Sequence, residues 1–198
     1  MKVSVIIRCR NEEEHIGLAI QSVIDHFKNP EIIIIDNQST DESMKVVSLF
    51  DRYDITKYSL NGNYTPGKAL NFGVKKANND TILILSAHSQ ITTLDIEMLD
   101  QWFRQGHVAV FGNQTPIYKG KKITKRYVWS HFTNDITENL YSKIEDRYFL
   151  HNAFCFYKKD FLLENPFDET LQGKEDRFWA KDMVEKNHKY LYDGFYQK

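Results

Sequence analysis

The stretch EIIIIDNQSTDE, residues 31–42, decides how this chain can fold. Its four consecutive isoleucines, Ile32–Ile35, are β-branched and apolar on both faces of a strand, which is typical of a strand buried on both sides. Such a strand belongs in the middle of a parallel sheet covered by helices. The run ends at Asp36, and small polar residues follow it. Ligands of open α/β sheets bind beyond the carboxyl ends of the strands, so Asp36 either accepts hydrogen bonds from a ligand or shapes the turn and caps the next helix.

Strand and helix patterns alternate on both sides of this stretch, over residues 1–85. Apolar runs predict strands at Val3–Ile7, Ile32–Ile35, Ile55–Leu60 and Thr81–Leu85. Apolar residues at helical spacing predict helices from Asn11 to Phe27, from Asp41 to Phe50 and from Pro66 to Ala77. We expect Asn11 to be the N-cap of the first helix, with acidic residues 12–14 in its first turn. Alternation of this kind is typical of a parallel or mostly parallel α/β sheet.

The order is looser after residue 85. We expect a helix capped by Thr93, a strand at Val108–Gly112 with residues 114–118 as a candidate extension of the sheet, a strand at Ala153–Tyr157, and a helix over Lys174–Lys186. Residues 119–150 are rich in aromatic side chains without a clear period, and they fit either a helical excursion packed on the sheet or a substrate-contacting flap. We expect residues 1–198 to form a single domain with halves 1–90 and 91–198.

The composition narrows the class of protein. The 198 residues are 41% hydrophobic and 27% charged, which is typical of an ordinary globular domain with one substantial core. A formal net charge of −1 gives no reason to expect a nucleic-acid partner. The basic run Lys119–Arg126 is a local exception, either a solvated loop or a contact for an anionic lipid or polymer surface.

Two further features concern the compartment. Cys9 and Cys155 lie in apolar, strand-like segments, so we expect free buried thiols in a reducing compartment. The sequence shows no signal peptide and no apolar run approaching roughly 18 residues, so we expect a cytoplasmic protein.

Three polar clusters follow predicted strands, at residues 8–11, 36–39 and 86–89. They converge on one edge of the sheet if the strands run parallel. Neither the glycine pattern of a dinucleotide-binding turn nor that of a P-loop is present. A carboxylate after the second strand, without a glycine-rich phosphate loop, suggests a nucleotide held by side chains and a metal ion.

Four blocks of the sequence resemble family 2 inverting glycosyltransferases. They are SVIIRCRNEEEHIGLAIQSV (4–23), IIIIDNQSTDES (32–43), PGKALNFGVKKANNDTILILSAHS (66–89) and AFCFYKKDFLLENPFDETLQGKEDRFWAKDM (153–183). Residues 95–150 and the last ten residues match only weakly. The resemblance implies a GT-A fold, an α/β architecture with a mostly parallel central sheet flanked by helices. It also implies a nucleotide-sugar donor, a divalent metal and inversion at the anomeric carbon.

The resemblance assigns nucleotide-sugar contacts residue by residue. The matched positions are Asp36 for the nucleotide base, Arg8, Arg10 and Glu13 along the nucleotide, Lys68 near the base and diphosphate, and His151 and Asn152 at the donor sugar.

The family's metal-binding DxD motif falls on Ser86-Ala87-His88, where both acidic positions are absent. Ser86 and Ala87 remain candidates for nucleotide-sugar contact. His88 takes the position that usually reaches the metal, and an imidazole binds Mn²⁺ better than Mg²⁺, which prefers oxygen ligands. Two alternatives stay open. Either Lys68, Arg8 or Arg10 carries the diphosphate charge in a weakened metal site, or His88 is a hydrogen-bonded residue at the end of a strand.

The resemblance also assigns the catalytic base. Asp176 in GKEDRFW matches the aspartate that accepts the proton of the attacking hydroxyl, and Glu175 is the second candidate. Adjacent helical residues point roughly 100° apart, so we expect only one of the two to face the site. Acidic capping of the helix is the alternative for both. Trp179 fits the core better than a sugar-stacking role.

These features predict an inverting glycosyltransferase that moves a sugar from a nucleotide sugar to a hydroxyl of a glycan or lipid-linked acceptor, in cell-surface or capsular polysaccharide synthesis. With a lipid-linked acceptor we expect a peripheral contact at the inner face of the membrane, through Lys119–Arg126. The alternative is a catalytically degenerate nucleotide-sugar-binding domain, which the loss of both DxD acids favours and the intact ED pair disfavours. A nucleotidyltransferase is disfavoured, because its glycine-rich and basic amino-terminal loop is missing.

Overall fold

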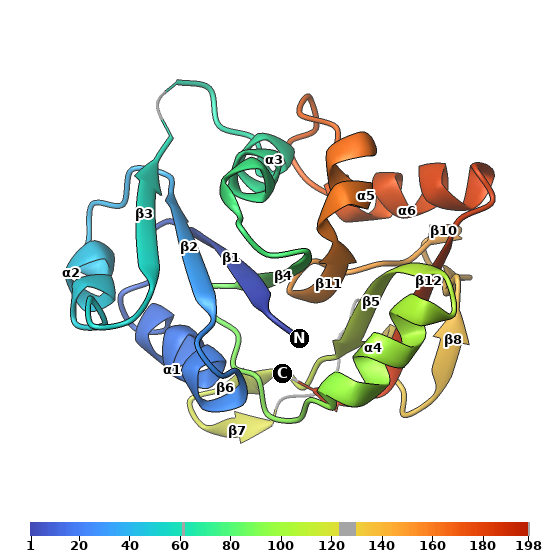
Figure 1. The fold of residues 1–198 in the computed structure, drawn as a ribbon, viewed down its shortest axis with the longest axis horizontal. Coiled ribbons are helices and arrows are strands. Elements are labelled where there is room, and N and C mark those ends of the chain that lie inside the picture. Colours follow the sequence, from blue (N-terminus) through green and yellow to red (C-terminus); the bar gives the residue numbers. More distant parts are fainter. Residues whose placement is uncertain (61, 123–129, 198) are drawn as a thin grey trace.

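The computed structural model describes residues 1–60, 62–122 and 130–197, and a large twisted sheet runs through its centre (Figure 1). The strands of this sheet are β1 (Val3–Cys9), β2 (Glu31–Asp36), β3 (Ile55–Ser59), β4 (Thr81–Ser86), β5 (His107–Asn113), β8 (Ile136–Glu138), β11 (Phe154–Lys158) and β12 (Lys189–Gln197), in the spatial order β3-β2-β1-β4-β11-β5-β12-β8. The helices are α1 (Ile16–His26), α2 (Ser43–Ser48), α3 (Pro66–Lys76), α4 (Ile96–Arg104), α5 (Lys159–Glu164) and α6 (Glu175–Glu185).

The sheet is mostly parallel, as the sequence predicts. β1 pairs in parallel with β2 and β4, β2 with β3, and β5 with β12. β11 runs antiparallel to both of its neighbours, β4 and β5, and β8 runs antiparallel to β12. The α/β fold class is therefore confirmed.

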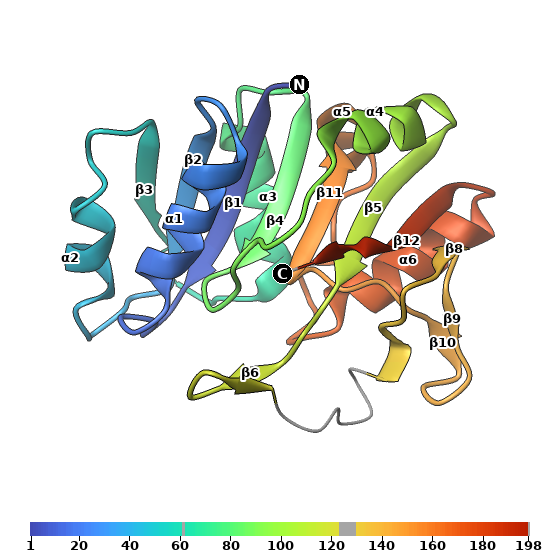
Figure 2. The ribbon, with the colours of Figure 1, turned by 90° about the horizontal axis from the view of Figure 1, so that it is seen from below.

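The isoleucine run explains why helices cover both faces. All four side chains of Ile32–Ile35 are buried. Ile33 and Ile35 belong to the core under α3, α5 and α6, whereas Ile32 and Ile34 belong to the core under α1, α2 and α4. Figures 1 and 2 show these two helical layers on opposite sides of the sheet. Burying each isoleucine contributes about 1.5–3 kcal/mol, which favours a central position for β2.

Two predicted helix starts are wrong. α1 begins at Ile16 rather than after Asn11, because the intervening residues hold the loop after β2. Asn11 has a left-handed φ of 55°, and its side chain accepts a hydrogen bond from the Thr40 amide. α4 is capped by Asp95, whose carboxylate accepts from the Met98 amide, and not by Thr93.

The segment between β5 and β11 contradicts the predicted sheet extension and the predicted helical excursion, while the substrate-contacting flap stays a prediction. Residues 114–118 do not extend the central sheet, since β6 (Ile117–Tyr118) pairs with β7 (Lys121–Lys122) in a separate hairpin. β9 (Tyr141–Ser142) and β10 (Arg147–Tyr148) form a second hairpin. Neither hairpin is a helical excursion. The basic run at 119–126 lies outside the described residues from residue 123 onward, so its predicted lipid contact remains a prediction.

The carboxyl edge of the sheet gathers the three polar clusters, as predicted. The strand registers place Cys9 opposite Asp36 and Arg8 opposite Ser86. In Figure 2 the N-terminus lies at the other end of β1, and the β6 and β9–β10 segments project beyond the carboxyl edge.

A backbone clamp ties α3 to the segment that leads into α6. Asn71 donates through Nδ2 to the Phe167 carbonyl at 2.8 Å and accepts from the Phe167 amide at 3.0 Å. Thr65, the N-cap of α3, donates its hydroxyl to the Glu169 carbonyl at 2.8 Å. These bonds fix the path of the chain just before α6.

Two further expectations can be compared with the structure. Cys9 and Cys155 are buried and free, as expected. Within residues 1–60, 62–122 and 130–197, no helix combines the length and apolar character needed to cross a membrane.

Candidate active site

Two neighbouring cavities open at the carboxyl edge of the sheet. The first, here called the carboxylate cavity, has a volume of about 250 Å³. It is lined by Arg8, Ser86, Glu145, His151, Asn152, Ala153, Lys174, Glu175, Asp176 and Arg177. The second, here called the arginine cavity, has a volume of about 210 Å³. It is lined by Arg8, Cys9, Arg10, Glu12, Tyr64, Ile84, Leu85, Ser86, Ala87, His88 and Asn152. Arg8, Ser86 and Asn152 line both cavities and form their junction.

The start of α6 supplies both acidic side chains of the carboxylate cavity. Lys174, the residue before the helix, has a left-handed φ of 61°, which turns the chain sharply into the first helical turn. Glu175 and Asp176 are both buried and both line the cavity. The expectation that only one could face the site is wrong, because Glu175 reaches the cavity beside Arg8 and Asp176 reaches it beside Asn152.

Asp176 is held as an ionised carboxylate by three hydrogen bonds. Its Oδ2 accepts from the Asn152 amide at 3.0 Å and from Arg177 Nη1 at 2.8 Å, and its Oδ1 accepts from the Arg177 amide at 2.9 Å. Burial by itself raises the pKa of Asp176. The charge of Arg177, together with His151 and the Asn152 amide, outweighs burial and leaves this pKa below its ordinary value.

Glu175 lies in a different electrostatic environment. Burial and the negative charge of Asp176 raise the pKa of Glu175 above its ordinary value. Arg8 offsets part of this rise, and its Nη2 lies 3.6 Å from Glu175 Oε1. The two adjacent carboxylates therefore titrate as a pair, with Asp176 the first to lose its proton.

Arg177 is a site residue that sequence reasoning missed. Its guanidinium carbon lies 4.4 Å from the centre of the Phe149 ring, a cation–π distance, and its Nε lies 3.9 Å from Glu145 Oε2. Arg177 is buried, so its charge acts on Asp176 with little screening by water. The sequence feature that could have identified Arg177 as a site residue is its position directly after the acidic pair in GKEDRFW.

The arginine cavity combines two cations with a histidine–glutamate pair. His88 Nδ1 lies 3.1 Å from Glu12 Oε1, and His15 Nδ1 lies 3.8 Å from Glu12 Oε2. Arg8 Nη1 donates to the Tyr64 hydroxyl at 3.5 Å. Sequence reasoning missed Glu12 and singled out Glu13. The turn before α1 aims Glu13 elsewhere, where its Oε2 accepts from the Glu42 amide at 2.7 Å.

The fit of these residues to a divalent metal rests on two donors. His88 offers an imidazole and Glu12 a carboxylate at the same cavity wall, with the Ser86 hydroxyl nearby. No cluster of three or more His, Cys, Asp or Glu side chains suited to a metal occurs in the part of the chain that the structure describes. The pair fits an ion such as Mn²⁺ that completes its shell with phosphate and water oxygens.

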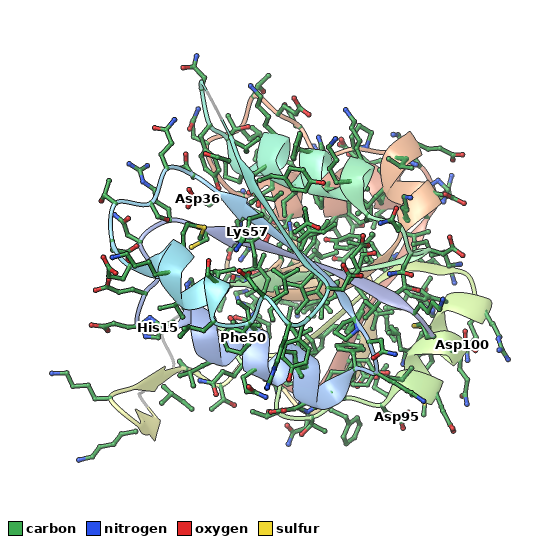
Figure 3. All side chains as sticks on the ribbon, turned by 60° about the vertical axis from the view of Figure 1, so that its left-hand side comes forward. His15, Asp36, Phe50, Lys57, Asp95 and Asp100 are labelled. Carbon is green, nitrogen blue, oxygen red and sulfur yellow. The ribbon has the colours of Figure 1, made fainter. Side chains whose placement is uncertain are left out.

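Some predicted binding residues lie away from the two cavities. Asp36 lies at the end of β2 (Figure 3) and is buried. Its carboxylate accepts from the Ser39 hydroxyl at 2.6 Å and from the Ser39 amide, so it shapes the turn, and its contact with a nucleotide base stays a prediction. Lys68 is half-buried, with Nζ 3.5 Å from the Asn63 carbonyl. Neither residue lines the carboxylate or the arginine cavity.

The remaining predicted residues lie at the cavities. His151 lines the carboxylate cavity, and its Nδ1 accepts from the Ala153 amide at 3.2 Å. Ala87 lines the arginine cavity. Trp179 is a core residue, since its ring is buried and its Nε1 donates to the Asn165 carbonyl at 2.7 Å.

Curated relatives match most of this chain but only part of their own length. A GalNAc(5)-diNAcBac-PP-undecaprenol beta-1,3-glucosyltransferase of Campylobacter jejuni is 29% identical over 98% of the chain, which spans 63% of that relative. An uncharacterized glycosyltransferase of Rickettsia conorii is 37% identical over 94% of the chain, which spans 30% of that relative.

Solved structures show the fold. TarS of S. aureus in complex with UDP-GlcNAc covers 100% of this chain with a TM-score of 0.74 and 21% identity, and the chain covers 58% of it. A mannosyltransferase of Pyrobaculum calidifontis in complex with GDP-Man and Mn²⁺ also covers 100% of the chain, with a TM-score of 0.73 and 15% identity, and the chain covers 56% of it. The GT-A fold is thus confirmed. The family model described as "Glycosyl transferase family 2" matches residues 4–168, and the chain belongs to this family.

Proposed function

We propose that this chain is an inverting glycosyltransferase domain, which transfers a sugar from a nucleotide sugar to a hydroxyl group of a glycan or lipid-linked acceptor. The observation that carries the proposal is the junction of the two cavities. A buried carboxylate pair lies on one side of it, Arg10 lies on the other side, and Arg8 lies at the junction itself. Inverting transfer needs this arrangement, because the attacking hydroxyl and the departing diphosphate lie on opposite sides of the anomeric carbon.

Asp176 acts as the general base in this proposal. A carboxylate accepts about four hydrogen bonds, and Asp176 receives three from the protein, so one acceptor site remains for the incoming hydroxyl. Its lowered pKa keeps it ionised at neutral pH. The hydroxyl proton passes to Asp176 while its oxygen bonds to the anomeric carbon and the bond to the diphosphate breaks. Glu175, the second candidate, balances the charge of Arg8 at the junction.

The arginine cavity would neutralise the negative charge of the departing diphosphate. Arg8 and Arg10 face it as guanidinium groups, which bind phosphate oxygens in a bidentate manner. His88 and Glu12 would hold a divalent metal there, Mn²⁺ in preference to Mg²⁺, and this metal would stabilise negative charge on the diphosphate. The Mn²⁺ bound with GDP-Man in the Pyrobaculum mannosyltransferase supports this assignment. Asp36, Lys68 and Glu13 line neither cavity, so only the family resemblance supports the proposed contacts of Asp36 with the base, Lys68 with the base and diphosphate, and Glu13 with the nucleotide.

The relatives support the proposed substrates. The name of the Campylobacter relative gives an undecaprenol-linked glycan as its substrate, which supports a lipid-linked acceptor and, with it, a peripheral contact with a membrane, which we propose to be at its inner face. A poly-beta-1,6-N-acetyl-D-glucosamine synthase of Staphylococcus epidermidis is 30% identical over 45% of the chain, which supports a role in polysaccharide synthesis. We further propose that residues 1–198 act as one domain, with 1–90 binding the nucleotide sugar and 91–198 facing the acceptor.

The test compares two aspartates of α6. Asp176→Asn keeps the shape of the side chain but removes the base, so we expect transfer to fall roughly 10²–10⁴-fold while nucleotide-sugar binding persists. Asp182→Asn, at an exposed position of the same helix, is the control and should leave transfer unchanged. Transfer of labelled sugar from UDP-GlcNAc and GDP-mannose to glycan and lipid-linked acceptors provides the readout. Full turnover by Asp176→Asn would remove Asp176 from the mechanism.

One observation favours the alternative, a nucleotide-sugar-binding domain without catalysis. Both acidic positions of the metal motif are replaced, by Ser86 and His88. Tight binding of a nucleotide sugar with neither transfer nor hydrolysis, in Mn²⁺ as well as in Mg²⁺, would support this alternative over the enzyme.

A further inference from the structure

Asn152 lies at the junction of the two cavities with one unused hydrogen-bond donor. The residue is 4% exposed, and its backbone amide donates to Asp176 Oδ2. Its side-chain oxygen Oδ1 accepts from the Tyr157 hydroxyl at 2.6 Å. Its Nδ2 makes no hydrogen bond of normal geometry with the residues described, although the amide is close enough to help lower the pKa of Glu175. A buried N–H without a partner costs about 1–3 kcal/mol, and a ligand oxygen that accepts from Nδ2 would remove this cost.

Tyr157 determines which end of the Asn152 amide faces the cavities. Tyr157 lies in β11 and is completely buried, with its ring packed edge-on against Trp179 at 5.2 Å and Phe167 at 5.7 Å between centroids. Burial raises the pKa of its phenol well above the ordinary value, so the hydroxyl keeps its proton, and it donates this proton to Asn152 Oδ1. This hydrogen bond holds the carbonyl end of the amide, which leaves the NH₂ end as the one without a partner among the described residues.

The position of the junction identifies what this NH₂ group meets. In the proposed reaction the diphosphate lies in the arginine cavity and the attacking hydroxyl lies beside Asp176. The transferred sugar is bonded to the diphosphate and attacked from the opposite side, so it must lie between them. Asn152 lines both cavities, and its backbone amide is hydrogen-bonded to Asp176, so it lies on the Asp176 side of the junction, where the sugar would lie.

We propose that Tyr157 is a positioning residue: it orients Asn152 so that Nδ2 donates a hydrogen bond to an oxygen substituent of the transferred sugar, a hydroxyl or an acetamido carbonyl. This inference rests on the proposed function, and it goes beyond it by assigning sugar recognition to a side chain buried below the site.

The test uses Tyr157→Phe, which removes only the hydroxyl, and measures binding by calorimetry. The probes are UDP-GlcNAc and GDP-mannose, each paired with its nucleoside diphosphate, UDP or GDP. Without the hydroxyl the amide is free to rotate, and we expect the nucleotide sugar that binds the wild type to bind about tenfold more weakly, within the range of one hydrogen bond. Binding of the matching nucleoside diphosphate should not change.

Two controls separate positioning from a general loss of structure. Tyr190→Phe removes another buried hydroxyl, one that donates to the Leu140 carbonyl at 2.7 Å, and should leave both affinities unchanged. In an Asn152→Ala background, Tyr157→Phe should have no additional effect on nucleotide-sugar binding, because the residue it positions is gone.

The outcomes distinguish this inference from the proposed function. Equal loss of nucleotide-sugar and nucleoside-diphosphate binding in Tyr157→Phe, or no loss of either, would overturn the positioning role while the proposed function stands. An additive effect of Tyr157→Phe in the Asn152→Ala background would also overturn it. A wild-type protein that binds none of the four probes would count against the proposed function itself.

Discussion

At the scale of single residues, Arg177 keeps Asp176, the proposed base, in its ionised form. It contributes a guanidinium and a backbone amide to Asp176, and it stacks on Phe149, which holds the guanidinium in place. The pKa of Asp176 therefore reflects a competition in which burial raises it and Arg177 lowers it. Removing the positive charge of Arg177 leaves only His151 and the backbone hydrogen bonds to oppose the effect of burial.

This competition predicts a pH effect. With Arg177→Gln the pKa of Asp176 should rise, because the variant removes the opposite charge that favours the ionised carboxylate. Because the base must be ionised, the acidic limb of the pH profile of kcat/KM should move to higher pH by the same amount. Arg147→Gln is the matched control, since Arg147 pairs with Glu145 at 3.7 Å and makes no ion pair with Asp176.

Arg177→Gln should also change the free energy of unfolding. The lowered pKa of Asp176 determines the direction of this change. A native pKa below the unfolded value stabilises the fold above the unfolded pKa, and this contribution is lost as the pH falls through the native pKa. Arg177→Gln should therefore lose stability at neutral pH and lose less at pH 3, measured by urea unfolding. Arg177→Lys, which keeps the charge, should show a smaller shift of the kcat/KM profile. An unshifted profile in Arg177→Gln would show that Asp176 is not the titrating base.

At the residue scale, the sequence predicted the side chains at strand ends and missed those placed by tertiary contacts. Arg8 and Ser86 follow directly from parallel register. Glu12 reaches the arginine cavity only because a turn precedes α1, and that turn depends on hydrogen bonds to the loop after β2. Tyr157 resembles any core aromatic until the structure shows its hydroxyl under Asn152.

The clamp between α3 and the segment before α6 acts at the scale of elements. Gly67, in the first turn of α3, approaches the backbone of Asp168 so closely that a Cβ atom at Gly67 would lie 2.4 Å from the Asp168 carbonyl oxygen. The Asn71 and Thr65 hydrogen bonds hold the two segments at this distance. Because Glu175 and Asp176 follow soon after, the clamp sets where the carboxylates lie.

This contact reverses the usual effect of a glycine-to-alanine change. In a helix such a change is normally stabilising by about 0.5–1 kcal/mol, but Gly67→Ala should destabilise by roughly 1–3 kcal/mol, because a backbone carbonyl must move. Transfer should fall as well, since the start of α6 moves with the clamp. Gly173→Ala is the control, because a Cβ there meets no atom within 4 Å. Urea unfolding of both variants is the measurement, and a stabilised Gly67→Ala would contradict the clamp.

At the element scale, aliphatic runs were more informative than aromatic ones. The isoleucine run in β2 and the TILIL run in β4 predicted both strands correctly. β12 was not predicted, because KYLYDGFYQ buries tyrosines instead of aliphatic residues and its pairing with β5 is interrupted by register shifts. The direction of β11 depends on its neighbours β4 and β5, which no local pattern encodes.

At the scale of the whole molecule, ligand binding should couple the cavities to global stability. A ligand that binds only the folded state stabilises it by about 2.7 kcal/mol at a hundredfold excess over Kd. For a domain of this size the expected rise in Tm is roughly 5–10 °C. UDP, GDP and their sugars, each with Mn²⁺, Mg²⁺ or a chelator, form the panel for thermal unfolding.

The metal assignment predicts how this rise depends on the ion. With one nucleotide the rise in Tm should be larger in Mn²⁺ than in chelator, and the Mn²⁺-dependent part should disappear in His88→Ala and in Glu12→Gln, since these side chains supply the two protein donors. His26→Ala is the control, because His26 lies in the last turn of α1, at the far end of that helix from Glu12. A rise in Tm that is equal in chelator and in Mn²⁺ would move the diphosphate charge onto Arg8 and Arg10 alone. Ser86 and His88 would then occupy the positions of the two acidic residues of the family's metal-binding motif without binding a metal themselves.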